Sequence, residues 1–117
     1  MNAKAIERVC RLPVEYRSGT ISWLDLLAQS GLREGSISIS QGQLVECLRN
    51  KPDLVKAWFA FSEDKRASPG WYLKKGGRGR YVVGWYPGPT ADSFTDRLVA
   101  CAEFIRRELG ATLGTAG

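Results

Sequence analysis

The residues best suited to molecular recognition gather between positions 65 and 86. This segment, KRASPGWYLKKGGRGRYVVGWY, contains six Lys and Arg and no acid, interleaved with Trp and Tyr. The rest of the chain holds the other eleven Lys and Arg and all twelve Asp and Glu, so the net charge of +5 arises from this segment alone. Cations of this kind contact phosphates or acidic protein surfaces, and aromatic rings stack on bases or anchor protein interfaces.

The sequence lacks the residue sets of common catalytic and metal centres. It contains no His, which removes the usual general base and any Ser-His or Cys-His arrangement. Cys10, Cys47 and Cys101 form no CxxC pair and fall in apolar helical contexts, whereas a structural zinc site needs four N or S ligands. We therefore expect buried free thiols, no metal, no cofactor, no catalytic residues and no enzyme activity. Chemistry based on carboxylates alone stays open.

Three further patterns are weaker candidates for a site. Gly76–Arg80 is glycine-rich, but it lacks the Lys-Ser/Thr of a P-loop and opens no helix, so turn geometry explains it. Glu63 and Asp64 are adjacent on a predicted helix and point in different directions, which favours helix termination over an acid/base pair. An aromatic set is predicted to be core, with a ligand pocket as the lesser alternative: Trp58, Phe59, Phe61 and Trp71.

A β-hairpin is predicted to position the cations. Strands 71–75 and 80–86 are rich in aromatic and β-branched residues, and GGRG between them tolerates positive φ. Strand alternation predicts one buried face, which consists of Trp71, Leu73, Tyr81, Val83 and Trp85. The second face is only partly apolar and consists of Tyr72, Lys74, Val82, Gly84 and Tyr86. A lone hairpin is marginal, so we expect it to lean on helices or to gain a third strand.

Four or five helices are predicted to pack on this antiparallel hairpin. Helical periodicity and stop signals give the ranges 2–11 (stopped near Leu12-Pro13), 22–31, 41–49, 52–63 and 93–109. Ser40 and Gln43 are spaced as a capping box, and Pro52 suits a first helical turn. Ser93 is predicted to cap the last helix. Ser36–Ile39 alternates as a candidate short third strand.

Length and composition indicate one α+β domain. The chain of 117 residues, 44% apolar and 25% charged, is typical of a soluble protein with a single core. No apolar run approaches the roughly eighteen residues needed to span a bilayer, and charges interrupt the N-terminal segment where a signal peptide would be apolar. We expect a cytoplasmic protein with one domain over residues 1–110 and a flexible C-terminal tail at 111–117.

The stretch FSEDKRASPGWYLKK…YVVGWY, followed by FTDRLVACAEFIRREL, resembles small bacterial immunity-type proteins. Such proteins partner polymorphic or contact-dependent toxins. The resemblance covers about residues 40–109 and rests on layout: a helical corner, a polar link, a Trp/Tyr hairpin and a closing helix. It implies a non-catalytic toxin inhibitor. Many such proteins are acidic because they cover basic nuclease sites, so the basic hairpin implies a toxin with an acidic face, or binding away from the toxin's active site.

These observations favour a protein-binding module whose partner has an acidic face. The expected partner-binding residues are Tyr72, Lys74, Lys75, Arg78, Arg80 and Tyr86. Their cations would speed association and their tyrosines would anchor the partner. The alternative is a nucleic-acid-binding domain, with Lys and Arg on phosphates and Tyr72, Tyr81 or Trp85 stacked on bases. A third interpretation assigns these cations only to solubility and protection of the sheet edge.

Overall fold

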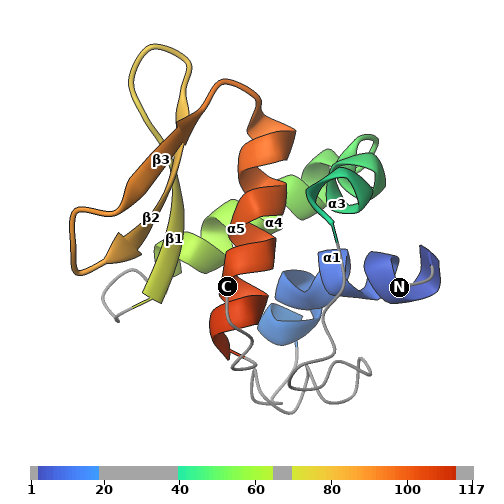
Figure 1. Cartoon of the computed structure of the whole chain (residues 1–117). Coiled ribbons are helices and arrows are strands. Elements are labelled where there is room, and N and C mark those ends of the chain that lie inside the picture. The colour runs from blue at the N-terminus through green and yellow to red at the C-terminus, as the bar shows by residue number, and fades with distance from the viewer. Residues whose placement is uncertain (1–2, 19–39, 65–69, 113–117) are drawn as a thin grey trace.

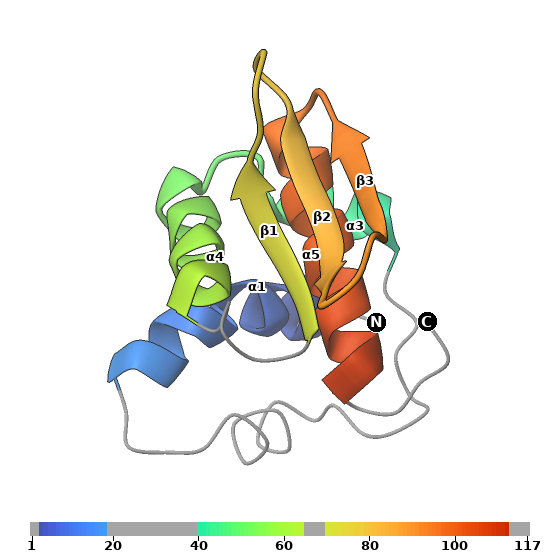
Figure 2. The same ribbon diagram turned by 90° about the vertical axis from the view of Figure 1, so that its left-hand side faces the viewer.

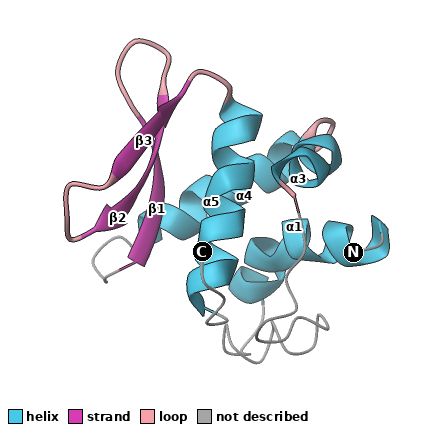
Figure 3. Ribbon diagram, in the orientation of Figure 1, coloured by secondary structure: helices cyan, strands magenta, loops and turns pink. Residues whose placement is uncertain are grey.

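The computed structural model describes residues 3–18, 40–64 and 70–112. In these residues the helices are α1 (Ala3–Ser18), α3 (Gln41–Leu48), α4 (Pro52–Asp64) and α5 (Arg97–Thr112). They pack on one side of an antiparallel sheet of order β1 (Gly70–Lys75), β2 (Tyr81–Tyr86) and β3 (Ala91–Phe94) (Figure 1; Figure 3). The predicted α+β class is confirmed, and the hairpin gains a third strand. The predicted helix 22–31 and the candidate strand Ser36–Ile39 lie outside the described residues.

Local signals set the central helices and the hairpin as predicted. Ser40 Oγ accepts from Gln43 N at 3.1 Å and Gln43 Oε1 accepts from Ser40 N at 2.9 Å, which completes the capping box of α3. Pro52 opens α4, and β1 pairs with β2 from Gly70↔Tyr86 to Lys75↔Tyr81. These elements lie within one residue of the predicted ranges, because their signals are local in sequence.

The third strand lies where the sequence predicted the start of the last helix. Residues 91–94 form β3, paired with β2 through Tyr81↔Phe94 and Val83↔Asp92. The cap of α5 is Asp96 rather than Ser93: Asp96 Oδ1 accepts from Leu98 N at 2.8 Å and from Val99 N at 3.3 Å. The prediction of a helix start at Ser93 is therefore wrong, since strand pairing with β2 uses these residues first.

Helix α1 continues through Pro13, where the sequence predicted a stop. An internal proline removes one backbone hydrogen bond and costs about 3 kcal/mol. Burial compensates here, because Val9, Leu12 and Pro13 lie in the core. The carbonyl of Cys10 accepts a hydrogen bond from Trp58 Nε1 at 3.0 Å, which ties α1 to α4. The predicted stop near Leu12-Pro13 is therefore wrong.

Helix α5 lies against the inner face of the sheet and supplies much of the core. Three consecutive small side chains, Ala100, Cys101 and Ala102, are fully buried and allow a close approach to neighbouring elements. The helix runs to Thr112, past its predicted end at residue 109. β1 is an edge strand of the sheet. The amide of Leu73 in β1 donates to the buried hydroxyl of Ser62 in α4 at 2.6 Å and so has a partner outside the sheet. No helix of the described residues is long and apolar enough to cross a membrane.

All three cysteines are free, and Cys10 and Cys101 are buried as predicted. Burial raises the pKa of the Cys101 thiol to about 12, and burial together with neighbouring Cys47 raises the pKa of Cys10. Cys47 is only half-buried, and Lys51 Nζ lies 3.7 Å from its Sγ. The two raised pKa values keep Cys10 and Cys101 as neutral thiols, which suits a packing role.

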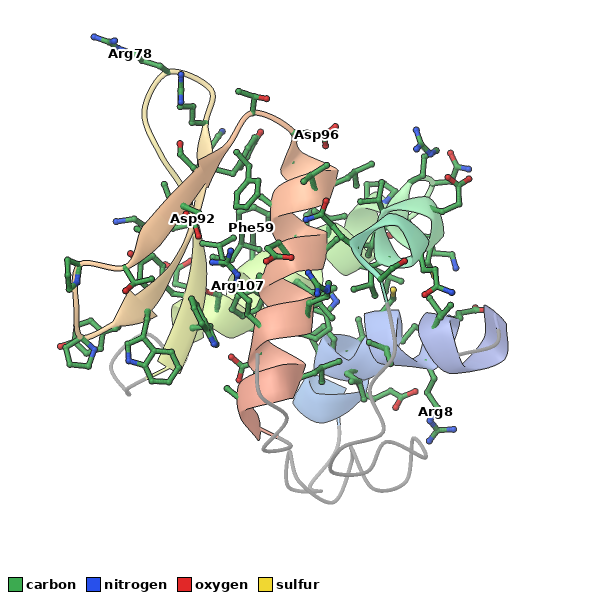
Figure 4. All side chains as sticks on the ribbon, in the orientation of Figure 1. Arg8, Phe59, Arg78, Asp92, Asp96 and Arg107 are labelled. Carbon is green, nitrogen blue, oxygen red and sulfur yellow. The ribbon has the colours of Figure 1, made fainter. Side chains whose placement is uncertain are left out.

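Glu103 of α5 connects three elements of the fold. Its carboxylate accepts from Arg107 Nε and Arg106 Nη1, each at 2.7 Å, and from Gln41 Nε2 of α3 at 3.3 Å. Arg107 in turn pairs with Asp92 of β3 at 2.9 Å (Figure 4). Glu103 is the centre of a polar network that joins α3, α5 and β3.

Acid should weaken this network. Burial alone raises the pKa of the Glu103 carboxyl, but the hydrogen bonds and charges of Arg107 and Arg106 outweigh it and hold the pKa below its ordinary value of 4.5. A lowered folded-state pKa means that the stabilisation is present above about pH 4.5 and is lost as the pH falls through the folded value. Denaturant unfolding by circular dichroism should therefore show a steeper acid loss of stability in the wild type than in Glu103→Gln. If the free energy of unfolding falls equally with decreasing pH in the wild type and in Glu103→Gln, the prediction is wrong.

Candidate partner-binding surface

The face of the sheet opposite the helices is uncovered by any described element. Figure 2 views the sheet from this side, with α5 behind it. Residues paired directly across an antiparallel sheet share a face. The pairings Tyr72↔Gly84, Lys74↔Val82 and Gly84↔Ala91 therefore define this outer face. The term outer face refers below to seven residues: Tyr72, Lys74, Val82, Gly84, Tyr86, Ala91 and Ser93.

Tyr72 lies flat across the middle of the outer face, over Gly84. A Cβ placed on Gly84 would lie 2.6 Å from Tyr72 Cζ and 2.7 Å from the Thr90 carbonyl oxygen, so only glycine leaves room for the ring. Lys74 Nζ sits 5.6 Å from the centroid of the Tyr72 ring, within cation–π range. The absence of a side chain at Gly84 thus makes room for the Tyr72 ring, and Lys74 lies over that ring.

Tyr86 extends the aromatic surface towards the far end of β2. It is 46% exposed and is one of two large hydrophobic residues exposed in the described part of the chain. Together with Tyr72, Lys74 and Gly88 it lines a shallow hollow of about 360 Å³. This hollow could seat one protruding side chain of a partner.

The β1–β2 loop places Arg78 at its tip, away from the helices (Figure 4). Arg80 N donates to the Gly77 carbonyl at 3.2 Å, and the two central residues of that turn, Arg78 and Gly79, have φ of 57° and 71°. Positive φ at both positions is typical of a type I′ turn, as the GGRG sequence predicts. A non-glycine residue in this region costs about 1 kcal/mol, so Arg78 occupies a position where glycine would be more favourable.

The structure brings together most of the predicted binding residues. Tyr72, Lys74 and Tyr86 share the outer face, and Arg78 lies at the loop tip. Arg80 comes two residues before Val82, so alternation puts it on the same face as Val82. Lys75 is separated from them, because it pairs with Tyr81 and faces the helix side of the sheet. Two cations of the basic segment, Lys65 and Arg66, lie outside the described residues.

Sequence reasoning missed a second group of side chains, which surrounds Lys75. Lys56 and Phe59 of α4, Tyr81 of β2 and Arg97 of α5 line the same cleft as Lys75. The i, i+3 spacing of Lys56 and Phe59 places them on one face of a helix, which is a usable signal. The contribution of Arg97 depends on β3, which the sequence did not predict.

Comparisons with known proteins do not assign either group of residues. No family model matches the chain, and no curated protein or solved structure matches it significantly. The resemblance to immunity-type proteins stays a prediction from sequence layout. A function must therefore be argued from the geometry and charge of the surfaces themselves.

Proposed function

We propose that this chain is a non-catalytic protein-binding module that engages an acidic partner through the outer face and the β1–β2 loop. The single observation that carries the proposal is a sheet face that no described element covers and that combines an aromatic platform with cations and, among the described residues, no acid. The proposal needs a partner that is itself a protein with an acidic patch of matching size.

Charge complementarity supports an acidic partner. Lys74, Arg78 and Arg80 are exposed, and residues 70–91 contain no Asp or Glu. The next acid, Asp92, faces the helix side and pairs with Arg107 at 2.9 Å, so it does not neutralise the outer face. An uncompensated patch of one sign steers an oppositely charged partner and raises its association rate.

The aromatic residues supply contact area. Tyr72 and Tyr86 present large, rigid surfaces with few rotatable bonds, and such residues dominate the binding energy of many interfaces. Tyr72 lies against the backbone at Gly84, which already restricts the space open to its ring before binding. The strained backbone of Arg78 adds support, because a costly conformation at an exposed tip suggests that its side chain is used.

The specific form of this proposal is that of an immunity protein, which binds and neutralises a cognate bacterial toxin in the cytoplasm. The sequence layout supports this form, and the basic outer face requires a toxin domain with an acidic face. Occlusion of the toxin by this surface requires no chemistry from the chain, in keeping with its lack of His.

Nucleic-acid binding is the competing function, because the same cations and tyrosines could contact phosphates and bases. Among the described residues, the outer face and loop offer three exposed cations, fewer than the six to ten phosphate contacts that give a DNA-binding protein a steep salt dependence. A protein partner therefore fits this surface better. Salt dependence separates the two, since binding to nucleic acid weakens steeply as salt rises.

The experiment is capture of partners from lysate with and without nuclease, followed by affinity measurement with the purified partner. Arg78→Glu/Arg80→Glu should weaken binding about tenfold or more without altering the unfolding midpoint, since both side chains are exposed. Arg8→Glu/Arg11→Glu is the matched control: it makes the same charge change on α1, away from the sheet (Figure 4). It should bind like the wild type.

Two results would decide against the proposal. An unchanged affinity in Arg78→Glu/Arg80→Glu would remove the loop from the interface. If only nucleic acid is recovered, and if it is lost at higher salt, the ligand is a nucleic acid bound through its phosphates and not a protein.

A further inference from the structure

A cleft on the helix side of the sheet lies apart from the outer face. It has a volume of about 430 Å³, within the range of small-molecule sites. Four elements supply its walls: α4, the paired ends of β1 and β2, and the start of α5. The lining side chains used below are Lys56, Phe59, Glu63, Lys75, Tyr81 and Arg97.

Two aromatic rings form an apolar wall of this cleft. Phe59 of α4 and Tyr81 of β2 meet edge to face, with centroids 6.1 Å apart and planes at 72°. Both are half-buried rather than closed off in the core. Phe59 is labelled in Figure 4, where it lies between the sheet and α5. Such a wall can take the flat face or edge of another ring.

Three cations from three different elements converge on this wall. The guanidinium carbon of Arg97 lies 5.8 Å from the centroid of the Phe59 ring, and Lys56 and Lys75 line the same cleft. Among the described residues, none of these three cations has an ion pair or a hydrogen bond to a side chain. Among the described lining residues Glu63 is the one acid, and it forms no ion pair with any of these cations. Like charges gathered around a cavity repel one another, and an anion between them relieves that repulsion.

We propose that this cleft binds a small anion carried on a flat apolar body. The anionic group, a phosphate or a carboxylate, lies between Lys56, Lys75 and Arg97, and the apolar body packs on Phe59 and Tyr81. The fold sets these groups in place before binding, since the three cations belong to α4, β1 and α5 and the two rings belong to α4 and β2. The site is independent of the proposed protein interface, because it lies on the opposite face of β1.

Titration followed by two-dimensional amide NMR tests the proposal on the whole chain. The probes are phenyl phosphate, benzoate, inorganic phosphate and benzyl alcohol. Phenyl phosphate or benzoate should give saturable shifts confined to the amides around the cleft, and the tighter of the two identifies the anionic group. Inorganic phosphate and benzyl alcohol should each bind more weakly by about tenfold or more. Inorganic phosphate lacks the aromatic ring, and benzyl alcohol lacks the anionic group.

Neighbouring lysines on β1 provide a matched pair of variants. Lys75→Gln combined with Lys56→Gln should weaken the aromatic anion about tenfold. Lys74→Gln removes one charge from the adjacent position on β1, which lies on the outer face, and should leave the affinity unchanged. All three lysines are exposed, so the free variants should keep the wild-type spectrum.

Three outcomes would overturn the inference. One is an absence of saturation with both aromatic anions. Another is a set of shifts centred on Tyr72 and Lys74, which would move the anion to the outer face. The third is equal binding of benzyl alcohol and phenyl phosphate, which would leave an apolar cleft without anion recognition.

Discussion

Replacing Trp58 with alanine is expected to lower the free energy of unfolding by about 4 kcal/mol. Trp58 is fully buried and packs edge to face on two rings. Its ring centroid lies 5.7 Å from that of Phe61 and 6.0 Å from that of Phe104. Its removal would leave a large cavity between α4 and α5. The free energy of unfolding of a domain of this size is about 5–15 kcal/mol, so the variant should lose a large part of its stability.

The matched control is Trp58→Phe, which keeps a ring but loses the indole N–H. That group donates to the Cys10 carbonyl at 3.0 Å, where α1 carries its internal Pro13. Losing this buried hydrogen bond should cost about 1 kcal/mol, well below the loss in Trp58→Ala. Denaturant unfolding by circular dichroism measures both. A loss below about 1 kcal/mol in Trp58→Ala would contradict a core organised around this ring.

Local sequence signals predicted the elements whose determinants lie within a few residues of one another. The capping box at Ser40, the first-turn proline at Pro52 and the glycine-rich loop are of this kind. Strand alternation also predicted the two faces of the hairpin correctly: Leu73 and Val83 are buried, and Tyr86 is exposed. Short-range geometry was sufficient in each case.

The wrong predictions depend on tertiary contacts. Pro13 is a helix stopper by propensity, but α1 continues because its flanking residues are buried. Ser93 is a plausible cap by type, but pairing of residues 91–94 with β2 moves the cap to Asp96. Both require the position of another element, which a local pattern does not contain.

The same limit applies to the candidate sites. The outer face follows from alternation along two adjacent strands, so most of its residues could be named from the sequence. The cleft beside Lys75 needs α4 and α5 to meet the sheet at the correct angle, and Arg97 lies beyond the unpredicted β3. The sequence therefore identified the cations and grouped Lys75 with the expected partner-binding residues, whereas in the structure Lys75 faces the helix side of the sheet.

The Gly84→Ala substitution should lower stability by about 2–3 kcal/mol, although it adds only a methyl group. The new Cβ would contact the Tyr72 ring, with Cζ at 2.6 Å, and the Thr90 carbonyl oxygen at 2.7 Å. The ring can swing away, but the carbonyl accepts a hydrogen bond from Trp85 N at 2.9 Å and is fixed. Gly77→Ala is the matched control, since nothing lies within 4 Å of its Cβ position. It should change stability by less than about 0.5 kcal/mol.

A double-variant cycle separates the two contacts and links them to binding. In a Tyr72→Ala background, Gly84→Ala should be less costly, because only the clash with the Thr90 carbonyl remains. An equal cost in both backgrounds would show that the Tyr72 ring does not rest on Gly84. In the single Gly84→Ala variant, the displaced ring should also weaken partner binding by about tenfold in molecules that remain folded. Stability and affinity would then fall together at Gly84, whereas at Arg78 and Arg80 affinity alone should fall. In the proposed interface the glycine positions the aromatic anchor, and the two arginines only contact the partner.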